Sequence, residues 1–303
     1  TVINNSINYE YDTTNSLMKD VGGNIRYYGA SPNNYIYFNC SDYSNQSSST
    51  CETWRIIGTF GNKTKLIRNS SIGEYSWDNK DTSTGAKSAY GKNDWTDARL
   101  MKLLNQGYES ETTGGSLYYN SGSGNCYSGQ NNATTACDFT STGIKNDTTR
   151  NMISDNTYSL LGWNNNSIYS NQIYEYERST GSVYTGTPTS WTGKVGLAYV
   201  SDYGYAADLS KCTKQLGSYN DSTCASNNWM KAIITNNSTN ASGWLLTHYY
   251  GDSCDTWRTY WAGNAGYSGA YYAFEVTPVL YLKYRISINS GTGTSSDPYQ
   301  IST

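Results

Sequence analysis

Short runs in which hydrophobic and polar residues alternate recur along this chain of 303 residues. Such runs predict β-strands that turn one face toward a core. The clearest pair, residues 53–60 and 65–68, flanks a turn that starts with Gly61-Asn62, which predicts a β-hairpin. Further strands are predicted over residues 35–38, 194–200, 227–230, 244–246 and 274–282, with Tyr299 and Ile301 in a last strand near the N-terminal end.

Two segments have the spacing of amphipathic helices. In the first, hydrophobic residues recur every three positions from Trp95 to Leu104, after a capping residue at Asn93 or Asp94 and before Gly107. The second begins at Asp147 and continues toward Leu161. Two helices among many short strands, with long loops between them, predict the α+β class.

One domain is expected, because no Pro/Gly-rich linker divides the chain after residue 25. Residues 1–24 are rich in Asn and Thr and predict a stem or linker, with a short helix over residues 15–21, so the folded domain would span 25–303. The chain starts at Thr1 without a signal peptide, and no window approaches 18 consecutive apolar residues. We therefore expect a mature or trimmed ectodomain.

The aromatic composition and the net charge narrow the class of protein further. The chain has 31 Tyr and 9 Trp but only 4 Phe, so its rings carry polar groups that tolerate contact with water. The net charge of -3 disfavours a nucleic-acid-binding protein, which would usually be basic.

Six of the seven cysteines form three pairs close in sequence. The separations are 11, 11 and 12 residues, and each pair encloses a polar loop; the pairs are Cys40 with Cys51, Cys126 with Cys137, and Cys212 with Cys224. Three local disulfides are the simplest prediction, although six cysteines allow 15 pairings. Disulfides favour an extracellular location. Cys254 is left outside these pairs, and is either buried, reactive or bonded to another chain.

The segment from His248 to Tyr272 has the composition of a binding surface. Its 25 residues include six Tyr, two Trp and the only His, between predicted strands at residues 244–246 and 274–282. Tyr with small polar residues is typical of antibody-like surfaces, and Trp and Arg dominate binding energies at interfaces. The predicted ligand-binding residues are His248, Tyr249, Tyr250, Asp252, Asp255, Trp257, Arg258, Tyr260, Trp261, Asn264, Tyr267, Tyr271 and Tyr272.

Catalytic and metal sites have weaker support. His248 has no triad or metalloprotease motif around it, and Glu175, Glu177 and Arg178 are interpreted as a solvated strand edge rather than as catalytic carboxylates. No Cys/His spacing suits zinc. A calcium site is the alternative to a metal-free protein, because carboxylate oxygens are plentiful. The candidate ligands are Asp202, Asp208, Asp252, Asp255 and Asp297, and the chain has no EF-hand loop.

Several stretches give the chain a resemblance to a group of secreted, pilin-like surface proteins of gut Firmicutes. They are PNNYIYFNCSDYSNQSSSTCETWRIIGTF, KNDWTDARLMKLLNQGYES, ISDNTYSLLGW, KVGLAYVSDYGYA and VTPVLYLKYRISINSGTGTSSDPYQI. The C-terminal half also resembles the C-type lectin fold of formylglycine-generating enzymes and of the variable proteins of diversity-generating retroelements. The matching ends are Trp244-Leu245-Leu246-Thr247 and Glu275-Val276-Thr277-Pro278, with Thr277 where that family usually has Arg.

These resemblances imply a C-type-lectin-like fold with two helices, short antiparallel strands and long disulfide-pinned loops. They also imply a cell-surface protein without enzymatic activity, whose segment 248–272 is diversified to bind a protein or glycan receptor. A structural subunit of a surface appendage is the main alternative, and a hydrolase is a third. No cofactor and no nucleic acid is expected, and a membrane would be reached only through a separate N-terminal anchor.

Overall fold

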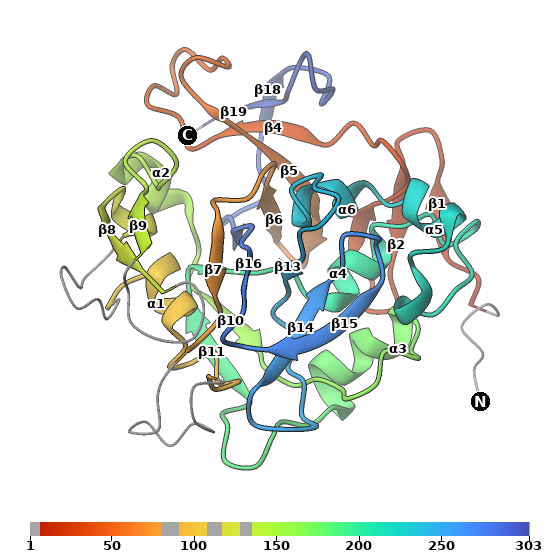
Figure 1. Cartoon of the computed structure of the whole chain (residues 1–303). Helices are drawn as coiled ribbons and strands as arrows, with labels where there is room; N and C mark the ends of the chain where they lie inside the picture. The colour runs from red at the N-terminus through yellow and green to blue at the C-terminus, as the bar shows by residue number, and fades with distance from the viewer. Residues whose placement is uncertain (1–6, 80–90, 108–116, 128–134, 303) are drawn as a thin grey trace.

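The computed structural model describes residues 7–79, 91–107, 117–127 and 135–302, which form a mixed α+β fold dominated by short strands (Figure 1). The larger sheet has eight strands. In spatial order they are β1 (Glu10–Asp12), β2 (Leu17–Lys19), β3 (Ile25–Tyr27), β5 (Glu52–Phe60), β6 (Lys63–Arg68), β17 (Val279–Tyr281) and β12 (Val195–Gly196), with β4 (Tyr35–Phe38) also paired to β5.

The β5–β6 hairpin, β4 and the final strand confirm the predictions made from alternation. Gly61 starts the hairpin turn with a φ of +61°, a conformation that glycine adopts without a steric penalty. Ile36 forms a parallel bridge with Tyr299, so the C-terminal segment does return to a strand near the start of the chain.

A second sheet of five strands carries the segment predicted to bind ligand. Its order is β15 (Ala265–Gly269), β14 (Asp255–Thr259), β13 (Gly243–Trp244), β16 (Ala273–Glu275) and β7 (Glu74–Ser76). Three two-stranded sheets complete the strands that the structure describes. They pair β8 (Ser123–Cys126) with β9 (Thr135–Asp138), β10 (Asn156–Ser159) with β11 (Ser190–Gly193), and β18 (Ile288–Ser290) with β19 (Gln300–Ile301).

Six short α-helices occur in the described part of the chain, where the sequence predicted two. They are α1 (Arg99–Leu104), α2 (Asp147–Met152), α3 (Ser170–Glu175), α4 (Val200–Tyr205), α5 (Ser222–Ser226) and α6 (Trp229–Ile234). Both predicted helices exist but are shorter than expected. The second ends at Met152 because residues 156–159 instead pair with β11.

One predicted helix and one predicted strand were wrong. Residues 15–21 contain β2 rather than a helix, because Leu17–Lys19 pair on one side with β1 and on the other with β3. Residues 227–230 begin helix α6 rather than a strand. The Asn228 side chain accepts a hydrogen bond from the Met230 amide, which caps this helix, and its buried residues follow helical spacing.

Residues 174–178 are not a solvated strand edge, since they lie in α3 and the π-helical turn Tyr176–Thr180 that follows it. The Glu177 carboxylate is fully buried there and accepts hydrogen bonds from Thr247 Oγ1 at 2.6 Å and the Ser201 amide at 3.0 Å. Burial of this carboxylate is possible because Arg178 and these donors surround it.

Two long predicted strands are broken. The predicted strand 274–282 divides at Thr277-Pro278 into β16 and β17, which belong to different sheets, since proline cannot donate to a ladder. The predicted strand 194–200 is reduced to β12, because Val200 starts α4.

The second half of the predicted stem is part of the larger sheet. β1 and β2 extend that sheet beyond β3, and Met18 is buried against Tyr28 and Tyr205. Asp20 accepts a hydrogen bond from Arg26 at 2.5 Å, and Arg26 also binds Asp202 at 2.7 Å. All three charged side chains are buried, so this segment is joined to the core by ion pairs.

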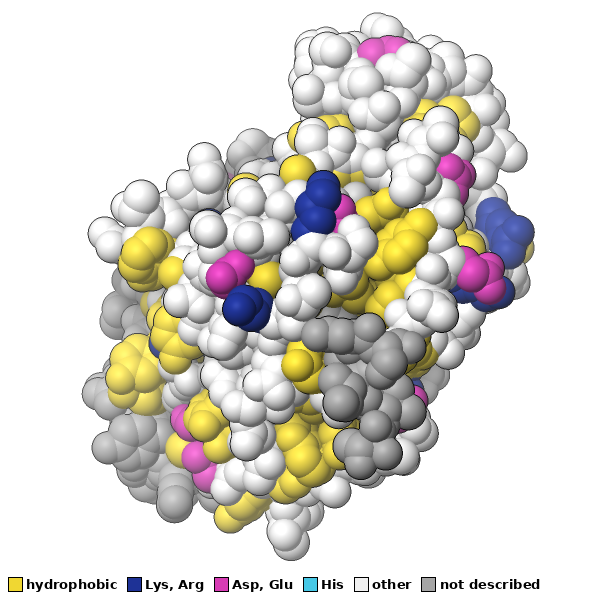
Figure 2. All heavy atoms as spheres, turned by 90° about the vertical axis from the view of Figure 1, so that its right-hand side faces the viewer, with side chains coloured by type: hydrophobic (Ala, Val, Ile, Leu, Met, Phe, Trp, Pro, Cys, Tyr) yellow, Lys and Arg dark blue, Asp and Glu magenta, His cyan; other side chains and the backbone are white. Residues whose placement is uncertain are grey.

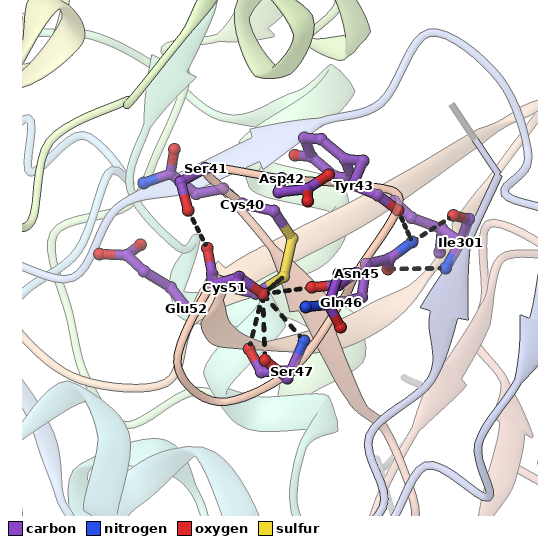
Figure 3. Close-up of a disulfide and its surroundings, with 12 residues drawn as sticks. Cys40, Ser41, Asp42, Tyr43, Asn45, Gln46, Ser47, Cys51, Glu52 and Ile301 are labelled. Atoms are coloured by element: carbon purple, nitrogen blue, oxygen red, sulfur yellow. Dashed lines mark hydrogen bonds between the residues drawn. A yellow bond between two sulfur atoms is a disulfide. The ribbon is translucent and has the colours of Figure 1, made fainter.

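All three predicted disulfides are present. The loop closed by Cys40 and Cys51 holds the C-terminal strand, as Figure 3 shows. The Gln46 amide donates to the Ile301 carbonyl at 2.7 Å and accepts from the Ile301 amide at 3.0 Å. A polar loop pinned by a disulfide therefore anchors β19 beside β4.

In the described residues no helix is long and apolar enough to cross a membrane. Figure 2 shows the molecule from the right-hand side of Figure 1, with the region of β4, β18 and β19 projecting as a lobe at the top. Backbone and side chains that are neither hydrophobic nor charged cover most of the described part of this face, and hydrophobic side chains gather in separate groups.

Candidate functional site

The predicted binding segment is an ordered hairpin rather than a long loop. β14 and β15 pair over five residue positions, from Asp255 with Gly269 to Thr259 with Ala265. Hydrogen bonds across the connecting turn join the Tyr260 amide to the Asn264 carbonyl at 2.9 Å. Since β14 also pairs with β13, the hairpin is a continuous part of the five-stranded sheet (Figure 1).

One side of the hairpin contributes to the core. Trp257 is fully buried, and its indole Nε1 donates to the Trp163 carbonyl at 3.0 Å. Tyr267, opposite Trp257 in the register, stacks on Tyr249 with ring centroids 4.0 Å apart. Tyr250 is placed edge-on to Trp163 at 5.6 Å. Trp257 therefore belongs to the core, although the sequence placed it among the predicted ligand-binding residues.

A row of neighbouring side chains connects the residues that follow β15 to Arg258 in β14 and Tyr260 in the hairpin turn. The Tyr271 and Tyr272 rings stack with centroids 4.2 Å apart, and Tyr272 is parallel to Phe274 within 17° at 5.7 Å. The Arg258 guanidinium then lies 4.6 Å from the centroid of Phe274 and 3.7 Å from that of Tyr260. We call these five residues the aromatic ladder.

Glycine at position 266 makes room for one end of the aromatic ladder. Gly266 is opposite Arg258 in the register, and a Cβ at this position would lie 2.6 Å from the Tyr260 ring. Any larger residue would displace that ring from the surface of the hairpin. The local sequence thus allows Tyr260 to lie flat beside Arg258.

Arg258 has no acidic partner among the residues that the structure describes. Its Nη1 donates to Ser242 Oγ, and its Nε is buried without a hydrogen-bond partner. Burial lowers the pKa of this guanidinium, and Tyr260 partly offsets that effect. The cation is stabilised mainly by the two rings, an arrangement typical of arginine in recognition surfaces.

Two of the predicted residues are exposed to an extent that suits binding. Trp261, in the hairpin turn, has half of its surface exposed, at 50%, and Tyr272 has 45% exposed. Asn264 is half-buried in the same turn. Both rings are therefore accessible to a partner.

His248 is buried at the base of the segment. Its Nε2 accepts a hydrogen bond from the Tyr184 amide at 2.9 Å, and burial lowers its pKa to about 4. The imidazole is therefore neutral at physiological pH and already used as an acceptor. In the described residues no hydroxyl or thiol forms a hydrogen bond with it.

The five candidate calcium-binding aspartates do not form one site. Asp202 is buried between Arg26 and Lys65, while Asp208 contacts Lys211. Asp252 and Asp255 do come together with Cys254, with one potential ligand atom of each within 4.8 Å. However, Asp252 Oδ1 accepts from the amides of both other residues, which is the usual geometry of an Asp-stabilised turn.

The sequence interpretation missed two members of this arrangement. Phe274 was assigned to the scaffold, but it connects Tyr272 to Arg258, and Ser242 binds the guanidinium. The two-residue spacing of Tyr272 and Phe274 was a usable signal, since such residues share a strand face. The contact with Ser242 had no local signal.

No protein-family model matches the chain, and neither the curated proteins nor the solved structures contain a significant match.

Proposed function

We propose that this protein is an extracellular, non-enzymatic binding protein or adhesin whose aromatic ladder and Trp261 contact a protein or glycan receptor. The observation that carries this proposal is the unbroken chain of contacts from Tyr271 through Phe274 to Tyr260, with Arg258 inside it. The three disulfides support the extracellular location.

The aromatic ladder has the physical properties of an affinity hot spot. Tyrosine offers a large contact area with few rotatable bonds, so little conformational entropy is lost on binding. The contacts between neighbouring rings hold the side chains in place before a ligand arrives, which lowers that cost further. Arg258 adds hydrogen-bond donors and a planar cation beside those rings.

The C-type-lectin-like fold is part of the proposal. Two features support it: the C-terminal strand returns to the N-terminal part of the sheet, and four of the five strands of the smaller sheet, β13 to β16, lie in sequence between β12 and β17. Membership of the pilin-like surface family and diversification by a retroelement belong to the same proposal. An experimental structure that superposes on a C-type lectin domain would test the fold.

Diversification can be tested position by position. If the segment varies among sister copies in one genome, substitutions should concentrate at exposed positions such as Trp261 and Tyr272. The buried Thr256, Trp257 and Thr259 should remain constant, because changes there would disturb the core. Substitutions spread evenly along the chain would contradict diversification.

The binding function is tested by screening the full chain on arrays of glycans and host-surface proteins. For any ligand found, Tyr272→Ala and Arg258→Lys should each weaken binding about tenfold or more, the effect of losing an interfacial hot spot. Tyr284→Ala is the matched control, since Tyr284 is 75% exposed but is not part of the aromatic ladder. A ligand whose affinity is unchanged in both test variants would exclude the aromatic ladder as its site.

A further inference from the structure

A second feature, separate from the aromatic ladder, is a buried arginine without an acidic partner. Arg55 is in the middle of β5 and is only 4% exposed. Its Nε donates to Asn34 Oδ1 at 2.5 Å, and its Nη2 donates to the Pro32 carbonyl at 3.3 Å. A guanidinium has five N–H groups, so three of them remain without a hydrogen bond to the described residues.

The charge of Arg55 is stabilised by rings but not neutralised. The guanidinium lies 3.6 Å from the centroid of Tyr35 and 4.8 Å from that of Trp229. The other buried arginines differ: Arg26 pairs with two aspartates and Arg68 with Glu52. Burial lowers the pKa of Arg55 to about 10, which reflects how poorly this position favours an uncompensated cation.

Arg55 borders a polar cavity of about 340 Å³ between β5 and α6. This volume is within the range of about 300–1,000 Å³ typical of small-molecule sites. Besides Tyr35 and Trp229, the cavity is lined by polar residues that include Ser31, Asn69, Asn236 and Asn237.

These polar side chains are available to a ligand. The side chains of Ser31, Asn69 and Asn237 form no hydrogen bond with any described residue, and Asn236 makes only a long contact of 3.5 Å to Glu275. Glu275 forms no ion pair with Arg55. Amide and hydroxyl groups beside an unsatisfied guanidinium are a donor set suited to a small oxyanion with hydroxyl groups.

We propose that this cavity, the Arg55 pocket, binds the carboxylate group of a small ligand. The carboxylate would accept hydrogen bonds from the unused N–H groups of Arg55, and Asn69 and Asn237 would bind its polar substituents. A planar carboxylate matches a guanidinium well, because two parallel hydrogen bonds form at once.

Calorimetric titration of the full chain at constant ionic strength tests this proposal with three probes: glucuronate, acetate and uncharged glucose. Saturable binding of glucuronate without binding of glucose is the expected result. Tighter binding of glucuronate than of acetate would identify an acidic sugar as the ligand class, and equal affinity would identify the carboxylate alone. Absence of carboxylate binding, or glucose binding as tightly as glucuronate, would overturn the proposal.

Two variants locate the binding at this pocket. Arg55→Lys keeps the charge but loses the planar fork, and should weaken glucuronate binding about ten- to hundredfold, as expected for a lost charge-assisted hydrogen bond. Asn69→Asp adds a competing carboxylate at the rim of the pocket without altering Arg55, and it should abolish binding even if the lysine variant fails to fold. Asn62→Asp, in the exposed turn at the far end of the β5–β6 hairpin, controls for the added charge. Unchanged affinity in folded Asn69→Asp would contradict the assignment.

Discussion

His248 connects the stability of the hairpin to pH. Its buried imidazole has a pKa of about 4, below the value of 6.5 expected in the unfolded chain. The unfolded chain therefore binds a proton more readily, so the contribution of His248 is complete above about pH 6.5 and declines as the pH falls toward 4. Between pH 7 and pH 5 the expected loss is about 2 kcal/mol.

Chemical denaturation of the wild type and of His248→Gln at both pH values would measure this loss. The glutamine variant lacks the titrating group but retains a side-chain oxygen for the Tyr184 amide, so its stability should change less over that range. Comparing the two proteins removes the contribution of other titrating groups. If the stabilities of the two proteins change equally with pH, unfolding is not coupled to protonation of His248.

Two tryptophans of the candidate site have opposite roles. Trp257→Ala should lower the free energy of unfolding by about 3–5 kcal/mol, the cost of a large cavity in a core, because this side chain is fully buried. Trp261→Ala should change it by less than about 0.5 kcal/mol, as is usual for surface positions. Urea denaturation of both variants checks the difference, and equal losses would contradict the described placement of the hairpin.

At the scale of elements, the predictions that held were mostly those decided by neighbours in sequence, with the final strand as the exception. The β5–β6 hairpin and the three disulfide loops each depend on residues within about a dozen positions of one another. The predictions that were wrong concerned β2, α6 and residues 174–178. In these segments tertiary contacts overrode the local propensity of the sequence. β2 pairs with two strands, and the buried Glu177 accepts hydrogen bonds from residues 24 and 70 positions away.

The clasp between the first disulfide loop and β19 is expected to hold the C-terminal strand. Gln46→Ala removes both hydrogen bonds to the backbone of Ile301, which should destabilise the protein by about 1–2 kcal/mol. The loss should be local, so amide hydrogen exchange should accelerate at Ile301 and less in the hairpin of β14 and β15. Gln106→Ala, at an exposed position outside the Cys40–Cys51 loop, is a control for the loss of a glutamine side chain. Unaltered exchange at Ile301 would show that the strand is held by other contacts.

At the scale of the whole molecule, the buried ion pairs determine where the domain begins. Arg26 and Asp202 are 176 positions apart, and Lys65 also binds Asp202. The asparagine-rich composition near the N-terminus favoured a stem or linker. Composition reflects local polarity, and it carries no information about an ion-pair partner 176 positions away. The same limit applies to the aromatic ladder, whose residues were largely identified by composition while Ser242 and the burial of Trp257 were not.

These contacts make the role of residues 1–24 measurable. Deleting them removes the buried Met18 and leaves Arg26 without Asp20. Loss of a buried methionine costs about 2–5 kcal/mol and a broken buried ion pair about 3–5 kcal/mol. We therefore expect the free energy of unfolding to fall by more than about 4 kcal/mol. Asp20→Asn in the full chain should lose less, because β1, β2 and Met18 remain in place. Denaturation of the two variants beside the wild type separates the ion pair from the packing. If the chain 25–303 is as stable as the wild type, the first 24 residues are an independent stem and the ion pairs of Arg26 do not stabilise the domain.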